Sequence, residues 1–192
     1  GSAPMKSNRW MSLLLSLALG AAFFTGCFTG CSAPSSRLSD EEIKLLRKDY
    51  PIYTQRPALV DMTPYTMEDI AVEMDTAIYG KALSESTQRS EKILYEVEVI
   101  QDVSGTYQPG DSITISIPSF MEGCIPEFEK GENLIILGQF QTDEENVVNF
   151  ADKGLYYVTK DGYALSSFEE TENQFSGMTA EDCVKQLYEL TK

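Results

Sequence analysis

Two stretches in the middle of the chain alternate strictly between apolar and polar residues, and they constrain the fold most. They are residues 95–99 (Tyr-Glu-Val-Glu-Val) and residues 113–117 (Ile-Thr-Ile-Ser-Ile), with a turn at residues 108–111 (Gln-Pro-Gly-Asp) between them. A period of two sends successive side chains to opposite faces of a β-strand. We therefore expect strands over residues 93–103 and 113–117, each with one face in the core and one in water.

Three further stretches are also expected to form strands. Residues 76–82 form a short strand in which Gly80 could mark a bulge. Residues 134–140 (Leu-Ile-Ile-Leu-Gly-Gln-Phe) are apolar on both faces, which predicts a central strand. Residues 155–158 and 163–165 are expected to pair as a hairpin around an Asp-Gly turn.

Helices are expected near both ends of the folded region. Ser39 and Glu42 have the spacing of a capping box at the start of a helix that Pro51 ends. Residues 63–71 are expected to form a short turn or helix. A second box, Thr179 with Asp182, begins the last helix. Its core-facing residues are expected to be Cys183, Val184, Leu187 and Tyr188.

Strands in meander-like order between helices predict a mainly β (α+β) protein. The specific expectation is a five-stranded OB-like barrel with an N-terminal helical segment and a C-terminal helix. We place the N-terminal helical and extended segment at residues 39–65, and the barrel with its C-terminal helix at residues 66–192. Loops are expected over residues 84–90, 119–130 and 142–149.

The N-terminal region has the pattern of a secretory leader. Residues 1–4 precede the first Met and are interpreted as a cloning remnant. Residues 5–26 hold two basic residues and then an apolar run of about 14, shorter than the ~20 that a membrane span needs. The run ends in Phe24-Thr25-Gly26-Cys27, and residues 28–31 repeat the same pattern. This pattern resembles the lipobox of bacterial lipoproteins, whose Cys thiol is alkylated by diacylglycerol.

Lipidation is expected at Cys27, which adjoins the apolar run, with Cys31 as the alternative. An ordinary cleaved signal peptide is the other interpretation. Two or three acyl chains, at ~0.8 kcal/mol per buried methylene, anchor a protein durably. Residues 27–38 are small and polar and are expected to be a tether. The folded part is thus expected outside the cytoplasm, held on the cell membrane by a lipidated N-terminal Cys.

The composition excludes several classes of chemistry. The chain has no His, which excludes Ser-His-Asp and Cys-His catalysis and His-ligated zinc. The leader holds two of the 15 basic residues and none of the 30 acidic ones, so 13 against 30 leaves a net charge of −17. Because nucleic-acid phosphates demand Lys and Arg, no nucleic-acid partner is expected. No cofactor and no metal are expected either.

Two cysteines remain in the folded region, Cys124 and Cys183. In an exported protein they can form a disulfide, which would contribute ~4 kcal/mol on the chain-entropy model. The alternative is a pair of buried free thiols. The sequence leaves both alternatives open.

Four patterned stretches, residues 75–81, 95–105, 113–117 and 131–138, together resemble a broad group of bacterial cell-surface lipoproteins of unestablished function. Their order is also similar to that of the netrin-like, OB-type modules of tissue inhibitors of metalloproteinases. The resemblance covers roughly residues 66–168 and implies an OB-type barrel. Ser104 stands where the pattern prefers Lys, and residue 133 is Asn where it prefers an aromatic. Those inhibitors chelate zinc through a free N-terminal Cys amine, which the expected lipid would modify here.

We expect a non-enzymatic binding domain for a protein, peptide or envelope ligand, because OB barrels bind ligands across a sheet face and its bordering loops. The membrane, reached through the lipid, is the other expected partner. The candidate ligand-facing residues are Phe120, Met121 and Glu122 in one loop and Asp143, Glu144 and Glu145 in another.

Two alternative functions remain. A His-free hydrolase of envelope or extracellular glycans would need a carboxylate pair. Its candidates are Glu96 with Glu98, or the cluster Glu169, Glu170 and Glu172. A Ca²⁺ site would use residues 143–146, although the Asp-x-Asp-x-Asp-Gly loop pattern is missing there.

The lipobox predicts that the mature chain begins at Cys27 and carries diacylglycerol on its thiol. Mass spectrometry of the N-terminal peptide from isolated membranes should show this modification. Cys27→Ser should abolish the incorporation of labelled fatty acid, whereas Cys31→Ser should leave it unchanged. An unmodified Cys27, in a chain that begins at another residue, would contradict the assignment.

Overall fold

The computed structural model describes residues 37–57, 66–168 and 174–192, and residues 36–192 form one compact unit. The expected leader, both candidate lipidation sites and the glutamate cluster at residues 169–172 lie outside the described residues. Among the described residues, no helix is both long enough and apolar enough to cross a membrane.

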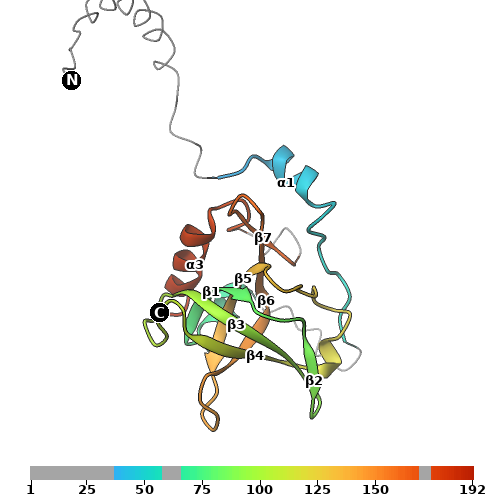
Figure 1. Cartoon of the computed structure of the whole chain (residues 1–192). Helices are drawn as coiled ribbons and strands as arrows, with labels where there is room; N and C mark the ends of the chain where they lie inside the picture. Colours follow the sequence, from blue (N-terminus) through green and yellow to red (C-terminus); the bar gives the residue numbers. More distant parts are fainter. Residues whose placement is uncertain (1–36, 58–65, 169–173) are drawn as a thin grey trace, which may run out of the picture. The chain divides into compact units, whose positions relative to one another are not determined.

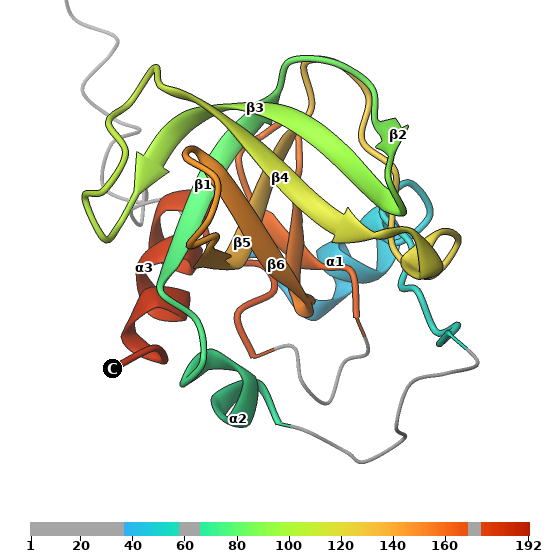
Figure 2. The same cartoon turned by 90° about the horizontal axis from the view of Figure 1, so that it is seen from below.

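Five strands form a closed barrel (Figure 1): β1 (Thr76–Ala82), β3 (Lys92–Asp102), β4 (Ser112–Pro118), β5 (Asn133–Phe140) and β6 (Val147–Val158). The ring closes because β1 pairs with both β3 and β5, while β6 pairs with both β5 and β4. Only β4 and β6 run parallel among these neighbours, and they lie side by side in Figure 2. Around the ring the strands follow in the order β1, β3, β4, β6 and β5, and β5 closes the ring on β1. The expected OB-like barrel is confirmed.

Two short strands extend the sheet. Strand β7 (Ala164–Ser166) pairs with the end of β6 and confirms the predicted hairpin. Strand β2 (Thr87–Arg89) pairs with the start of β3, so the expectation of a loop over residues 84–90 is wrong. The expected loop at residues 142–149 is also too long, because β6 already pairs with β4 from Val147. Strand β2 forms a local hairpin with β3, whereas the start of β6 is fixed by pairing with the distant strand β4.

The barrel interior holds the larger part of the core. Tyr95, Val97 and Val99 of β3 and the three isoleucines of β4 are all buried there, as the alternation predicts. Ser116 differs from its prediction, because it is only 3% exposed. It lies beside Asn149 of β6, which covers that edge of β4.

A second core lies outside the barrel, beneath α3 (Ala180–Glu189). The predicted residues Cys183, Val184 and Leu187 are fully buried against β1, β5 and β6. This second core explains why β5 is apolar on both faces: Leu134 and Ile136 line the interior, whereas its other face meets α3. At the start of the helix, the Thr179 side chain accepts a hydrogen bond from the Asp182 backbone N–H, which confirms the N-cap but not the return bond from the Asp182 side chain that the predicted box requires.

The N-terminal part, residues 37–57, is bonded to the barrel, and we name it the strap. Its helix α1 (Asp40–Leu46) has the predicted capping box but ends at Leu46, before Pro51. Ile43 and Leu46 of this helix pack against the core, whereas Leu45 is 78% exposed. Backbone N–H groups of Leu38 and Tyr53 donate to the carbonyls of Gly177 and Ser167, each at 2.8 Å. After the strap, Thr66 and Asp69 form the capping box of α2 (Met67–Ala71).

Gly80 lies where β1 changes register against β3, which confirms the predicted bulge. A Cβ at this position would approach Val97 Cγ1 to 2.4 Å and the Glu98 carbonyl oxygen to 3.0 Å. Real Cβ atoms essentially never show the first of these distances, and the second is tighter than most, so only glycine lets β1 bend onto β3 here without displacing a neighbour. The closure of the barrel therefore depends on this residue.

We predict that Gly80→Ala destabilises the protein by about 1–3 kcal/mol, because the added methyl group overpacks the interior. Denaturant unfolding would measure the free energy of unfolding. In a Val97→Ala background the obstructing Cγ1 atom is absent, so the added cost of Gly80→Ala should fall by at least ~0.5 kcal/mol. Equal costs in the two backgrounds would show that the contact with Val97 is not what selects glycine.

Candidate functional site

Strands β3 and β4 lie side by side (Figure 2), and the side chains on their outward faces are mostly polar; we name this surface the β3–β4 face. Its members are Leu94, Glu96 and Glu98 of β3, and Ser112 and Thr114 of β4, while Ser116 on the same side of β4 is buried beside β6. Strands β3 and β4 pair along its whole length. The Thr114 hydroxyl donates a 2.8 Å hydrogen bond to the Glu96 carboxylate. Carboxylates and hydroxyls thus dominate a face that OB barrels commonly use for ligands.

At the end of this face, where β4 stops, the surface is hollowed. We name this cavity of about 510 Å³ the hairpin hollow. It is lined by Ser90, Glu91, Lys92, Ser116, Pro118, Ser119, Phe120 and Asn149. Its residues come from the β2–β3 turn, the end of β4, the short 3₁₀ helix η1 (Ser119–Met121) and β6. Three separate segments of the chain, residues 90–92, residues 116–120 and Asn149, therefore converge on one cavity.

The β2–β3 turn at this hollow is strained. Ser90 and Glu91 have φ angles of 50° and 62°, in the left-handed region that glycine or asparagine normally occupies. Each such residue costs on the order of 1–3 kcal/mol and persists only where its surroundings hold it. The backbone N–H of Ser119 donates to the Glu91 carbonyl at 2.9 Å and ties η1 to the turn. Strained backbone of this kind is often found at binding sites.

Only one of the three candidates in the first loop lines the hollow. Phe120 is 58% exposed and presents an apolar ring at its wall. Met121 cannot face a ligand, because it is buried in the barrel interior. Glu122 is exposed but lies outside the hollow. The sequence did not point to the other residues of the hollow, among them Ser90, Lys92 and Asn149.

The second predicted loop lies at the opposite end of the β3–β4 face. The backbone N–H of Thr114, near the start of β4, donates to the Asn146 carbonyl at 2.8 Å. Phe120 follows the end of β4, and β4 and β6 run parallel, so the loop that enters β6 is far from it. Asp143, Glu144 and Glu145 are exposed in that loop. The two predicted loops therefore border the face at its two ends and do not form one site.

Glu96 and Glu98, the carboxylate pair considered for glycan hydrolysis, lie on the same outward face of β3, as expected. The described residues contain no group of three or more His, Cys, Asp or Glu that could hold a metal ion. The acidic loop at residues 143–146 is thus exposed chain without a preformed cluster of carboxylate ligands.

Cys124 and Cys183 are free thiols in the structure, so the disulfide alternative is corrected. Cys124 belongs to the interior core, whereas Cys183 lies beneath α3 in the outer core. The wall of the barrel separates these two cores and keeps the sulfur atoms apart. Burial raises the pKa of the Cys183 thiol well above its usual range, which keeps it protonated and a poor nucleophile.

Compared with known proteins, the chain matches no family model and no curated protein sequence.

Proposed function

We propose that this chain is a membrane-anchored extracytoplasmic lipoprotein whose OB-like barrel is a non-enzymatic binding domain. The hairpin hollow and the adjoining β3–β4 face form its ligand site. The observation that carries this proposal is the hollow itself. There an exposed Phe120 ring, a strained turn and several polar groups converge on one end of a barrel face.

The hollow offers both components of a ligand site. Binding sites combine an apolar wall with a few polar groups that orient the ligand. Phe120 supplies the wall, and full burial of such a side chain is worth roughly 1.5–3 kcal/mol. Ser90, Lys92 and Asn149 supply donors and acceptors around it. A protein segment, a peptide or an envelope polymer could use both components.

The charges around the site favour these ligands over nucleic acid. Glu96 and Glu98 lie on the face that leads from the hollow, and they would repel phosphate groups. The anchor in this proposal rests on the lipobox pattern at Cys27. A lipid anchor followed by a short tether would keep the binding face next to the cell envelope.

We predict that Phe120→Ala weakens binding of the envelope ligand at least tenfold and leaves stability within about 0.5 kcal/mol. Soluble peptidoglycan fragments, surface polysaccharide and a peptide library would be titrated against ¹⁵N-labelled protein. Shifted resonances should map to the β3–β4 face. The matched control is Leu45→Ala, which truncates a more exposed apolar side chain on α1, outside the hollow. Equal binding by both variants, or no shift with any probe, would contradict the proposal.

A further inference from the structure

A second and larger cavity lies between the strap and the barrel, and we name it the strap groove. Its volume of about 740 Å³ falls within the range of roughly 300–1,000 Å³ found for ligand pockets. Its walls are strap residues 49–51 and Tyr53, together with segments 126–133 and 157–160. It shares no residue with the hairpin hollow, so it is a separate site.

One side of the strap groove is an aromatic wall. The rings of Tyr50 and Tyr157 meet edge-to-face with centroids 5.4 Å apart, and Phe128 lies 6.1 Å from Tyr157. The Tyr157 hydroxyl donates a 2.8 Å hydrogen bond to the Pro51 carbonyl. The Tyr53 backbone is bonded to the barrel in the same region of the strap. The wall is therefore held in place without a ligand.

The groove carries an excess of negative charge. Four carboxylates and two ammonium groups line it: Asp49, Glu127, Glu129, Glu132, Lys130 and Lys160. Within the described part of the chain, none of the four carboxylates forms a salt bridge. The two excess negative charges thus face solvent in a groove with an aromatic wall.

Glu132 connects the charge to the aromatic wall. Its carboxylate accepts a 2.8 Å hydrogen bond from the Glu129 backbone N–H, which fixes its position. Burial raises the pKa of Tyr50 and of Tyr157, and the negative charge of Glu132 raises the pKa of each further. Glu132, Tyr50 and Tyr157 all line this one cavity.

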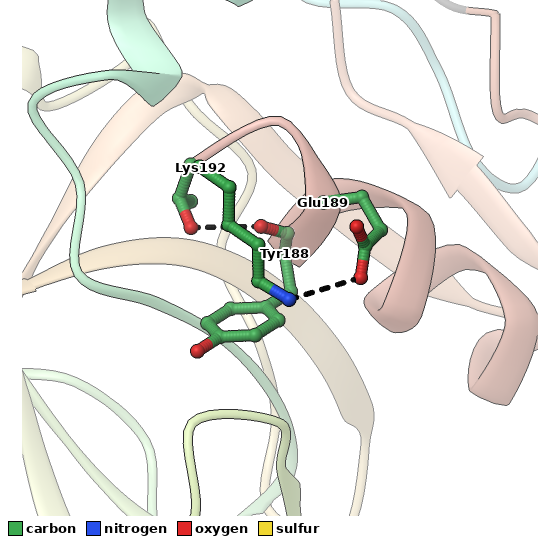
Figure 3. Close-up of polar contacts among 4 residues, drawn as sticks. Tyr188, Glu189 and Lys192 are labelled. Atoms are coloured by element: carbon green, nitrogen blue, oxygen red, sulfur yellow. Dashed lines mark hydrogen bonds and ion pairs between the residues drawn. The ribbon is translucent and has the colours of Figure 1, made fainter.

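A cation is the ligand that an aromatic wall and carboxylates recognise together. Aromatic faces attract ammonium and guanidinium groups, as do carboxylates. An anion would be repelled, and an apolar ligand would desolvate the carboxylates without compensation. The chain shows the same arrangement within itself at the end of α3 (Figure 3). There the Lys192 ammonium lies 4.7 Å from the centroid of the Tyr188 ring and 3.2 Å from the Glu189 carboxylate.

We propose that the strap groove binds an organic cation, with its ammonium or guanidinium group at Glu132 and against the Tyr50 ring. The cation is carried either by a free polyamine or by a Lys or Arg side chain of a peptide. This site acts independently of the ligand site on the β3–β4 face, so the failure of one proposal leaves the other intact.

Isothermal titration of the detergent-solubilised full chain tests this proposal with two probes, spermidine and an acetylated, amidated tri-lysine peptide. One saturable site is expected, with an affinity that falls as salt rises. Tyr50→Ala should weaken binding about 2–30-fold, the range that corresponds to cation–π energies. Glu132→Gln should weaken it by a similar factor, because it removes the charged acceptor of the cation. Tyr50→Phe keeps the ring and should bind as the parent does. Saturation by only one probe identifies the source of the cation and supports the site.

The matched control is Glu73→Gln, which removes an equal charge from the exposed turn after α2, outside both cavities, and should leave the affinity unchanged. Thermal melts of each variant confirm that it is folded. The proposal is overturned if neither probe binds at millimolar concentration. It is also overturned if Glu73→Gln weakens binding as much as Glu132→Gln does, because the attraction would then be a general effect of the acidic surface.

Discussion

The structure depends on β1 hydrogen-bonding to two strands at once. Its pairing with β5 on one side and β3 on the other turns the sheet into a ring, and Gly80 allows the close approach to β3. Closure removes the free strand edges that an open sheet would expose. It also divides the apolar residues into an interior core and an outer core beneath α3, which is why β5 needs apolar residues on both faces.

The same closure places the candidate sites. Because β6 returns parallel to β4, the loop that enters β6 lies at one end of the β3–β4 face and Phe120 lies at the other. The strap crosses a different part of the barrel and forms the groove with segments 126–133 and 157–160. Two cavities with different chemistry result: an exposed phenyl ring among hydroxyl and amide groups in one, and carboxylates beside tyrosines in the other.

Local patterns predicted most of the elements. Alternation located β3 and β4, and the Ser39, Thr179 and Asp-Gly signals located two helix starts and a hairpin. The β2–β3 turn was not predicted, because Ser90 and Glu91 adopt left-handed angles without glycine. The parallel pairing of β4 with β6 and the strap groove join residues far apart in the sequence, and no local pattern reports such contacts. Of the predicted site residues in the first loop, only Phe120 lines the hairpin hollow. Met121 is buried by the way η1 packs on the barrel, which the local sequence does not show.

Hydrogen exchange of the β1 amides, followed by NMR, tests barrel closure most directly. Successive amides of a strand point to opposite neighbours, so in a closed barrel β1 donates to β3 and to β5. We predict that the amides on both sides of β1 exchange slowly, with protection close to that of global unfolding. Fast exchange of the amides directed toward β3, with slow exchange only toward β5, would show an open sheet and contradict the account.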